Sequence, residues 1–152
     1  MLGSEHPEVF ATPIVVGVVA DTHLPATRRS LPGPLVEGLR GVDLILHAGD
    51  VNTPEALALF AALAPVRAVV GNNDVAELQR RLPRRRFFHF GRFSAGLMHG
   101  HDVEHLTARQ AAERELVGRV DLAIFGHSHR ALCEWQGRSL LFNPGSPTQK
   151  RW

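Results

Sequence analysis

The sequence predicts a single α/β domain, and two patterns along the chain support that class. In the first two thirds, apolar runs rich in β-branched residues alternate with helical patterns, as in βαβ units. In the last third, hairpin patterns follow one another. A chain of 152 residues has room for one domain, because compact domains usually contain ~100–200 residues. We therefore predict a flexible leader over residues 1–12 and one domain over residues 13–152.

Buried strands are predicted where the sequence is almost continuously apolar, because strands covered on both faces do not alternate in polarity. Four such runs occur: Ile14–Ala20, Leu44–Ala48, Val66–Val70 and Leu122–Phe125. Two hairpins are predicted from strand-like segments that flank a short turn with glycine. They join Phe87–Phe90 to Phe93–Met98 and Arg130–Trp135 to Arg138–Phe142.

The helix that follows the second predicted strand has a clear start signal. Thr53 offers an N-cap hydroxyl, Pro54 suits the first helical position, and Glu55 places an acid in the first turn. We expect this helix to run to about Leu63. A second helix is predicted over Glu104–Gly118. The buried stripe of the first helix is expected to contain Leu57, Phe60, Ala61 and Ala64.

Composition excludes several classes of protein. The longest apolar run, around Ile14–Ala20, is far shorter than the ~18–20 residues that span a bilayer. Glu5, His6 and Glu8 interrupt the region where a secretory signal needs apolar residues, so a cytoplasmic location is expected. The single cysteine, Cys133, excludes an internal disulfide and a cysteine-built zinc knuckle. It is expected to be a small buried apolar residue.

The charge balance does not by itself indicate a nucleic-acid partner. Seventeen basic and fifteen acidic side chains leave a formal net charge of only +2. One basic cluster comprises Arg80, Arg81 and residues 84–86. We expect it to be a solvated helix end that Pro83 breaks, and the alternative is a rim that binds an anionic substrate.

Residues able to bind metal follow five successive predicted strands. Because carboxyl ends of parallel strands share one edge of a sheet, we expect these side chains to converge in one cleft. Taken singly, each has an ordinary explanation as a turn or surface residue. A turn alone gives no reason for Asp, His or Asn at every strand end, so metal binding is favoured. The seven residues are Asp21, His23, Asp50, Asn72, His99, His127 and His129.

The ordered motifs resemble those of the calcineurin-like metallophosphoesterases, and within them the small YfcE-like phosphodiesterase branch. The resemblance covers about residues 13–147. It implies a four-layer αββα sandwich, in which two mixed β-sheets lie face to face between helices, and a phosphoesterase that depends on divalent metals. The matching motifs are Asp21-Thr22-His23, Gly49-Asp50, Gly71-Asn72-x-Asp74, His99-Gly100-His101, Gly126-His127-Ser128-His129 and Asn143-Pro144-Gly145-Ser146.

The resemblance further implies a site for two metal ions that share Asp50. Imidazole, carboxylate and amide ligands suit Mn, Ni, Fe, Co or Zn better than Mg or Ca, and manganese is the first expectation. Two such ions clamp an in-line phosphoryl displacement and acidify a bridging water to hydroxide. One ion would be held by Asp21, His23, Asp50 and His129, and the other by Asp50, Asn72, His99 and His127.

One departure from the wider superfamily bears on the substrate. Members that resemble the Ser/Thr protein phosphatases carry Gly-Asn-His, whose histidine can protonate the leaving oxygen, with a supporting Asp. This chain has Asn73 and Thr53 at those positions, and an amide cannot supply that proton. Either His101 or a metal-bound water substitutes, or the leaving groups depart without much help. The candidate catalytic residues are Asn72, His99 and His101.

Neighbouring residues are expected to support the site. The second N–H of a ligating histidine is expected to reach Asp74 or, as an equal alternative, a backbone carbonyl. His47 is expected to be a satisfied core histidine, and residues 143–146 a tight turn near the site. His101 has two open interpretations, contact with substrate phosphate or capping of the loop before the helix.

The sequence thus predicts a phosphodiesterase that acts on a small phosphodiester or nucleotide-like substrate. The alternatives are a phosphomonoesterase or nucleotide hydrolase that uses the same site, and a non-catalytic scaffold resembling the retromer subunit of this fold. A nuclease would draw on the arginine cluster, but a nucleic-acid partner is not expected. The resemblance suggests a homodimer or a homotetramer but leaves the oligomeric state open, and no membrane partner is expected.

Overall fold

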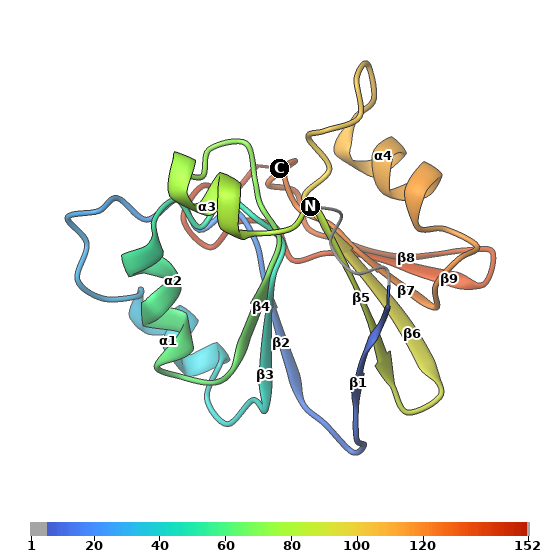
Figure 1. The fold of residues 1–152 in the computed structure, drawn as a ribbon, viewed down its shortest axis with the longest axis horizontal. Coiled ribbons are helices and arrows are strands. Elements are labelled where there is room, and N and C mark those ends of the chain that lie inside the picture. Colours follow the sequence, from blue (N-terminus) through green and yellow to red (C-terminus); the bar gives the residue numbers. More distant parts are fainter. Residues whose placement is uncertain (1–5, 152) are drawn as a thin grey trace.

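The structure is a computed structural model that describes residues 6–151, and it has four layers (Figure 1). Two β-sheets lie face to face. Helices α1 (Gly33–Gly38), α2 (Pro54–Ala61) and α3 (Ala76–Arg81) pack on the outer face of the smaller sheet. Helix α4 (Ala108–Glu115) packs on the outer face of the larger sheet. The predicted αββα sandwich is confirmed.

The two sheets differ in strand direction. The larger sheet is mixed, because both predicted hairpins fall in it as antiparallel pairs. The smaller sheet is purely parallel, so the prediction of two mixed sheets is wrong for it. Its strands are joined by helical crossovers, which connect parallel strands. The larger sheet has the order β1 (Glu8–Phe10), β5 (Arg85–Phe90), β6 (Phe93–Met98), β7 (Leu122–Ile124), β9 (Ser139–Asn143) and β8 (Leu132–Gln136), and the smaller one β2 (Val16–Val19), β3 (Leu44–His47) and β4 (Val66–Ala68).

Alternating side chains of β3 belong to two different cores. Leu44 and Leu46 join the core between the two sheets, whereas Ile45 joins the core under the helices of the smaller sheet. A third core lies between α4 and the larger sheet. All residues of β3 are buried, as its continuous apolar sequence predicts.

Helices α2 and α4 confirm the two predicted helices in their place but not in every detail. Thr53 caps α2, and its hydroxyl accepts a hydrogen bond from the Ala56 N–H at 3.2 Å. Ala56 is buried and Ala61 is exposed, so the prediction of a buried Ala61 is wrong. The buried positions follow an i, i+4 spacing instead. Helix α4 is shorter than predicted, because a capping box at Thr107 starts it.

The leader predicted over residues 1–12 is wrong where Glu8–Phe10 form strand β1. This strand pairs in parallel with β5 at the edge of the larger sheet. Arg67 of β4 binds the Glu8 carboxylate, with its Nε 2.8 Å from Oε2, so the strand is tied to both sheets. Three residues carry too short a pattern to be recognised as a strand in the sequence. Residues 1–5 lie outside the described residues.

Cys133 is exposed, which corrects the expectation of a buried apolar residue. It lies on β8, the edge strand of the larger sheet, whose residues alternate between exposed and half-buried positions. The outward-facing side chains of an edge strand can remain exposed to solvent. A five-residue strand pattern in the sequence does not show whether the strand lies at the edge or in the centre of a sheet.

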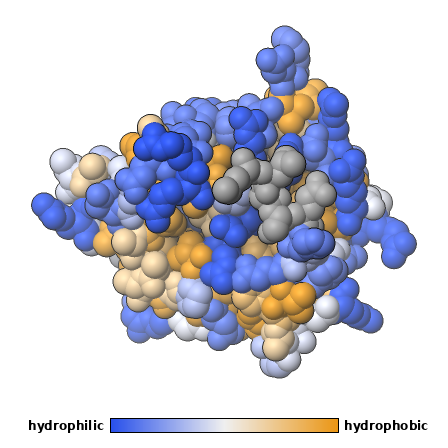
Figure 2. Space-filling model, viewed as in Figure 1, coloured by the Kyte–Doolittle hydropathy of each residue, from blue (hydrophilic) through white to orange (hydrophobic). Residues whose placement is uncertain are grey.

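The surface differs between the two ends of the strands. On the face drawn in Figure 2, hydrophilic residues cover most of the upper part, whereas hydrophobic residues gather in the lower part.

Within residues 6–151, no helix has the length and apolar character needed to cross a bilayer. The cytoplasmic location stays a prediction.

Candidate metal centre

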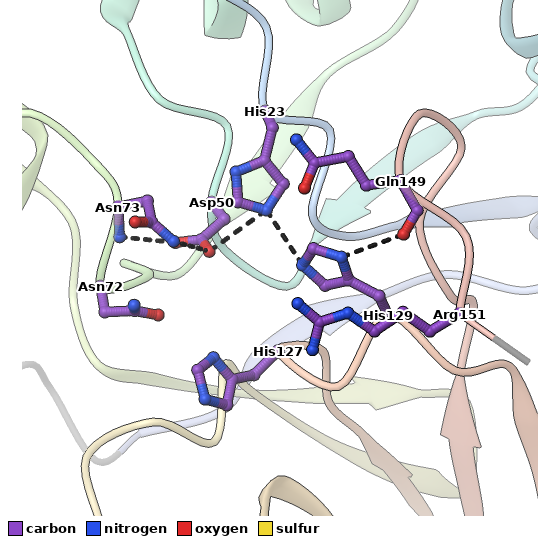
Figure 3. A pocket seen from close by; sticks show the side chains of 8 residues that line it. All are labelled: His23, Asp50, Asn72, Asn73, His127, His129, Gln149 and Arg151. Carbon is purple, nitrogen blue, oxygen red and sulfur yellow. Dashed lines mark hydrogen bonds and ion pairs between the residues drawn. The ribbon is translucent and has the colours of Figure 1, made fainter.

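All seven predicted metal-binding residues lie on loops that leave the carboxyl ends of strands, at one edge of the two sheets. Five of them line a cavity of about 420 Å³, together with Asn73, Gln149 and Arg151 (Figure 3). The other two, Asp21 and His99, are fully buried beside it. The strands carry their donors to one place, as the strand-end pattern predicts.

The first cluster consists of Asp21, His23 and His129. The Nε2 atoms of His23 and His129 lie 3.1 Å apart. Asp21 Oδ1 lies 3.8 Å from the first of these atoms and 3.5 Å from the second. Atoms that bind one ion at ~2.0–2.2 Å lie roughly 3–3.5 Å apart, so two of the three distances have the spacing of a ligand set and the third is slightly longer.

The second cluster consists of Asp50, His99 and His127, whose donor atoms all lie within 4.8 Å of one another. The Nε2 of His99 lies 3.4 Å from Asp50 Oδ2 and 3.1 Å from Asn72 Oδ1. The amide oxygen of Asn72 therefore lies beside this cluster as a further oxygen donor.

Asp50 belongs to the second cluster but also lies beside the first, so it stands where the two clusters meet. Its Oδ2 is 3.5 Å from His23 Nε2 in the first cluster and 3.4 Å from His99 Nε2 in the second. The carboxylate is oriented by Asn73, whose backbone N–H and side-chain amide each donate a hydrogen bond to it at 2.8 Å. This is the position that the predicted bridging role requires.

Asp21 has one oxygen that is held and one that is free for a cation. The His127 N–H donates to Oδ2 at 2.8 Å, whereas Oδ1 is buried and has no hydrogen-bond partner in the described structure. Burial raises the pKa of Asp21 to about 7, and the nearby charge of Asp50 adds to this effect. A buried carboxylate oxygen facing imidazole nitrogens fits a divalent cation, which would stabilise its charge.

Three of the four imidazoles are predisposed to act as neutral ligands. Burial lowers the pKa of His23, His127 and His129, which favours the unprotonated form that binds metal. Burial also opposes charge on the coupled pair of Asp50 and His99, but each partner favours the charged form of the other. As a result, the pKa of Asp50 is lowered and that of His99 is raised.

Backbone carbonyls orient two of the histidines. The Nδ1 of His99 lies 2.7 Å from the Ala48 oxygen, and the Nδ1 of His129 lies 3.0 Å from the Gln149 oxygen. With Nδ1 donating to these oxygens, the Nε2 lone pairs face the clusters. Asp74 instead accepts the N–H groups of Asn52 and Gly71 at 2.7 Å, so the carbonyl alternative is correct.

Five of the seven donors have left-handed backbone conformations. They are Asp21, His23, Asp50, His127 and His129, with φ between 42° and 67°. Left-handed backbone costs a non-glycine residue ~1–2 kcal/mol, and such costs concentrate at functional sites. Gly71 shows how tightly the loops pack, because a Cβ there would overlap the carboxylate of Asp50.

The remaining predicted residues also lie near the site. His101 is half-buried, with its ring centroid 5.2 Å from that of His99 and 6.3 Å from that of His127. His47 is fully buried and lies 3.1 Å from the Thr22 hydroxyl, which confirms a satisfied core histidine. Ser146 donates to the Asp21 carbonyl at 2.7 Å, so residues 143–146 reach the site as expected.

Three residues that line the cavity were not predicted from the sequence to contribute to the site. They are Asn73, which orients Asp50, and Gln149 and Arg151. Asn73 stands beside the predicted donor Asn72, so its place in the motif was visible but its contact with Asp50 was not. Gln149 and Arg151 follow the last recognised motif, where the sequence has no periodic pattern to place them.

Comparisons with known proteins agree with this geometry. The sequence model of the calcineurin-like phosphoesterase superfamily domain matches residues 14–152. A probable metallophosphoesterase of Methanothermobacter thermautotrophicus is 36% identical over 138 residues, which cover 91% of this chain and 80% of that protein.

Solved structures show the same fold. Wild-type Vps29 from Entamoeba histolytica, in complex with Zn²⁺, matches with a TM-score of 0.74 and 29% identity over 91% of this chain and 77% of that one. An archaeal phosphodiesterase matches with a TM-score of 0.67 and 23% identity over 86% and 83% of the two chains, a likeness that concerns the fold alone.

Proposed function

Because this chain belongs to the calcineurin-like phosphoesterase superfamily, we propose that it is a divalent-metal-dependent phosphodiesterase with a dinuclear centre. The observation that carries the proposal is the position of Asp50 between two clusters of donors. A carboxylate shared in this way is suited to hold two ions at once. Manganese is the first choice of metal, since the mixed nitrogen and oxygen ligands suit transition metals.

The ligand set would comprise both clusters together with Asn72. Bound there, two divalent ions supply charge neutralisation and activate a water for in-line attack on phosphorus. The chain's own residues prepare the place for this chemistry. Asn73 keeps the Asp50 carboxylate in position, and the carbonyls of Ala48 and Gln149 keep two imidazole rings in one orientation.

The preference for diesters is supported by the lack of a strong proton donor among the residues that the structure describes at the cavity. Asn73 stands where related protein phosphatases have a histidine, and its side-chain amide already donates to Asp50. His101 is the nearest substitute, but burial and the charge of His99 lower its pKa. A mostly neutral imidazole is a weak acid at pH 7, so the site is suited to leaving groups that need little protonation.

The first test compares two substrates on protein of known metal content. We expect Mn²⁺-loaded or Ni²⁺-loaded protein to hydrolyse a bis(aryl) phosphodiester faster than an aryl phosphomonoester. Faster monoester turnover would favour the phosphomonoesterase alternative. No turnover of either ester, with two ions shown to be bound, would defeat the enzyme proposal.

The alternative to an enzyme is a non-catalytic binding scaffold. The structural similarity to Vps29 is the reason to test this alternative. Metal analysis distinguishes the two. If protein supplied with Mn²⁺ and dialysed against metal-free buffer retains no ion, the scaffold becomes the better description. Retention of about two ions per chain is the result that the enzyme proposal requires.

A further inference from the structure

The segment that follows β9 is anchored to the loop that carries the first cluster. Ser146 donates to the Asp21 carbonyl at 2.7 Å, and Thr148 donates to the Thr22 carbonyl at 3.0 Å. The Arg151 N–H donates to the His129 carbonyl at 3.2 Å. These three bonds position the backbone of Arg151 beside the metal-binding residues.

The side chain of Arg151 turns into the cavity. It lines the cavity with His127 and His129, and Figure 3 shows the guanidinium extending into the space between these two rings. Because an arginine side chain is long and flexible, an exposed one can also extend away from the protein into solvent. Here it lies at the mouth of the candidate metal centre.

This guanidinium has no carboxylate within 4.0 Å among the residues that the structure describes. By contrast, Arg67, Arg81 and Arg109 each form an ion pair. Burial has the larger effect on the pKa values of Asp21, His23 and His129, but the charge of Arg151 acts to lower each of them. The cation therefore faces the place where two further cations are expected, and like charges repel.

We propose that Arg151 binds a phosphoryl oxygen of the substrate in the cavity, a role that rests on the proposed function. An anion placed there would be attracted both by the guanidinium and by the ions that the clusters would hold, and it would offset the repulsion between these cations. The planar guanidinium can donate two parallel hydrogen bonds to phosphate oxygens. Arg151 is thus a binding residue for the phosphate group, supplied by the segment after β9, which carries none of the seven predicted metal-binding residues.

The arginine cluster of residues 80–86 is less suited to this role. Arg84 and Arg85 lie 3.6 and 3.8 Å from the Asp102 carboxylate, and Arg85 also pairs with Glu115 at 3.4 Å. Arg86 donates to the Ala68 carbonyl at 2.9 Å. These side chains already have partners. The expectation of a solvated helix end holds for the exposed Arg80 and Arg81 of α3, but it is wrong for Arg85 and Arg86, which are half-buried on β5.

The test measures binding of inorganic phosphate to the Mn²⁺-loaded protein by titration calorimetry, and therefore needs no turnover. In Arg151→Gln we expect the Kd for phosphate to rise about ten- to a hundredfold, because a charge-assisted contact is lost. Arg151→Lys should lie between this variant and the unchanged protein. Arg119→Gln, a surface change at the opposite end of the larger sheet, is the matched control and should leave Kd unchanged.

Metal content separates phosphate binding from a structural role. Arg151→Gln should retain both ions, since it removes a repulsive charge and no ligand. With the aryl phosphodiester, we expect the variant to raise KM more than it lowers kcat. An unchanged phosphate Kd, or a loss of metal in step with phosphate, would overturn the assignment. Absent hydrolysis by metal-loaded unchanged protein would overturn the proposed function instead, while leaving the phosphate titration interpretable.

Discussion

The two ends of the strands carry the same kinds of polar side chain but satisfy them differently. At the end away from the cavity, Asp121 Oδ2 accepts hydrogen bonds from the backbone and hydroxyl of Ser94, at 2.8 and 2.9 Å. At the cavity end, Asp21 Oδ1 is buried without a partner. A carboxylate that the fold itself satisfies stabilises the fold, whereas one that the fold leaves unsatisfied is available to a ligand.

Among substitutions that test this difference between the two ends of the strands, we expect the largest effect from Asp50→Ala. Asp50→Ala removes the carboxylate shared by both clusters, so bound metal should fall from about two ions per chain to none. Diester hydrolysis should fall roughly a thousandfold or more, since metal ions contribute several kcal/mol to the transition state. Elemental analysis and initial rates measure both quantities. Asp121→Ala is the control, and if it also lost metal, the contrast between the two ends would be broken.

His47 tests whether a satisfied group at the cavity end behaves as part of the fold. Burial lowers its pKa to about 3, so the unfolded chain takes up a proton more readily. The stability that depends on neutral His47 is fully present above pH 6.5 and is lost as pH falls toward 3, on the order of a few kcal/mol. Denaturant titrations of chelator-treated protein should show a shallower acid decline for His47→Asn. An identical decline would assign the acid sensitivity to other groups.

Gly71 tests whether packing beneath Asp50 matters as much as the donors do. In Gly71→Ala the new Cβ must displace the Asp50 carboxylate or its backbone. We expect metal affinity to fall about ten- to a hundredfold although every ligand is retained, as when supporting contacts are lost. Gly38→Ala is the matched control, because a Cβ there meets nothing within 4 Å. Equal metal affinities in the two variants would contradict the tight packing of these loops.

His101 should give the smallest effect of the four. It is half-buried beside the clusters but belongs to neither, so His101→Ala should retain both ions. Turnover of the diester should fall about tenfold, and more for esters with poor leaving groups, if His101 contacts substrate or leaving oxygen. His105→Ala, an exposed change on the following loop, should have no effect. Loss of metal from the His101 variant would place this residue among the ligands.

Predictability from the sequence differed between neighbouring elements for physical reasons. Helix α2 was recognisable because a Thr-Pro-Glu start signal is local to three residues, whereas the uncapped α1 has no side-chain cap to reveal it. Strand β3 was recognisable from its apolar run, but β1 is three residues long and depends on pairing with β5. Start signals and apolar runs lie within a few consecutive residues and can be recognised in a sequence. The pairing of strands far apart along the chain cannot be recognised in this way.

The features of the candidate site can likewise be separated into those that the sequence determined and those that depend on the tertiary structure. The sequence alone determined which donors follow which strands, and that an asparagine replaces the proton-donating histidine, because these facts depend on order along the chain. Only the tertiary structure decided that His23 and His129, 106 positions apart, bring their nitrogens within 3.1 Å, and that Arg151 enters the same cavity. Such contacts arise when two sheets close on each other, and the loop conformations that complete them are imposed by packing rather than by the preferences of the residues.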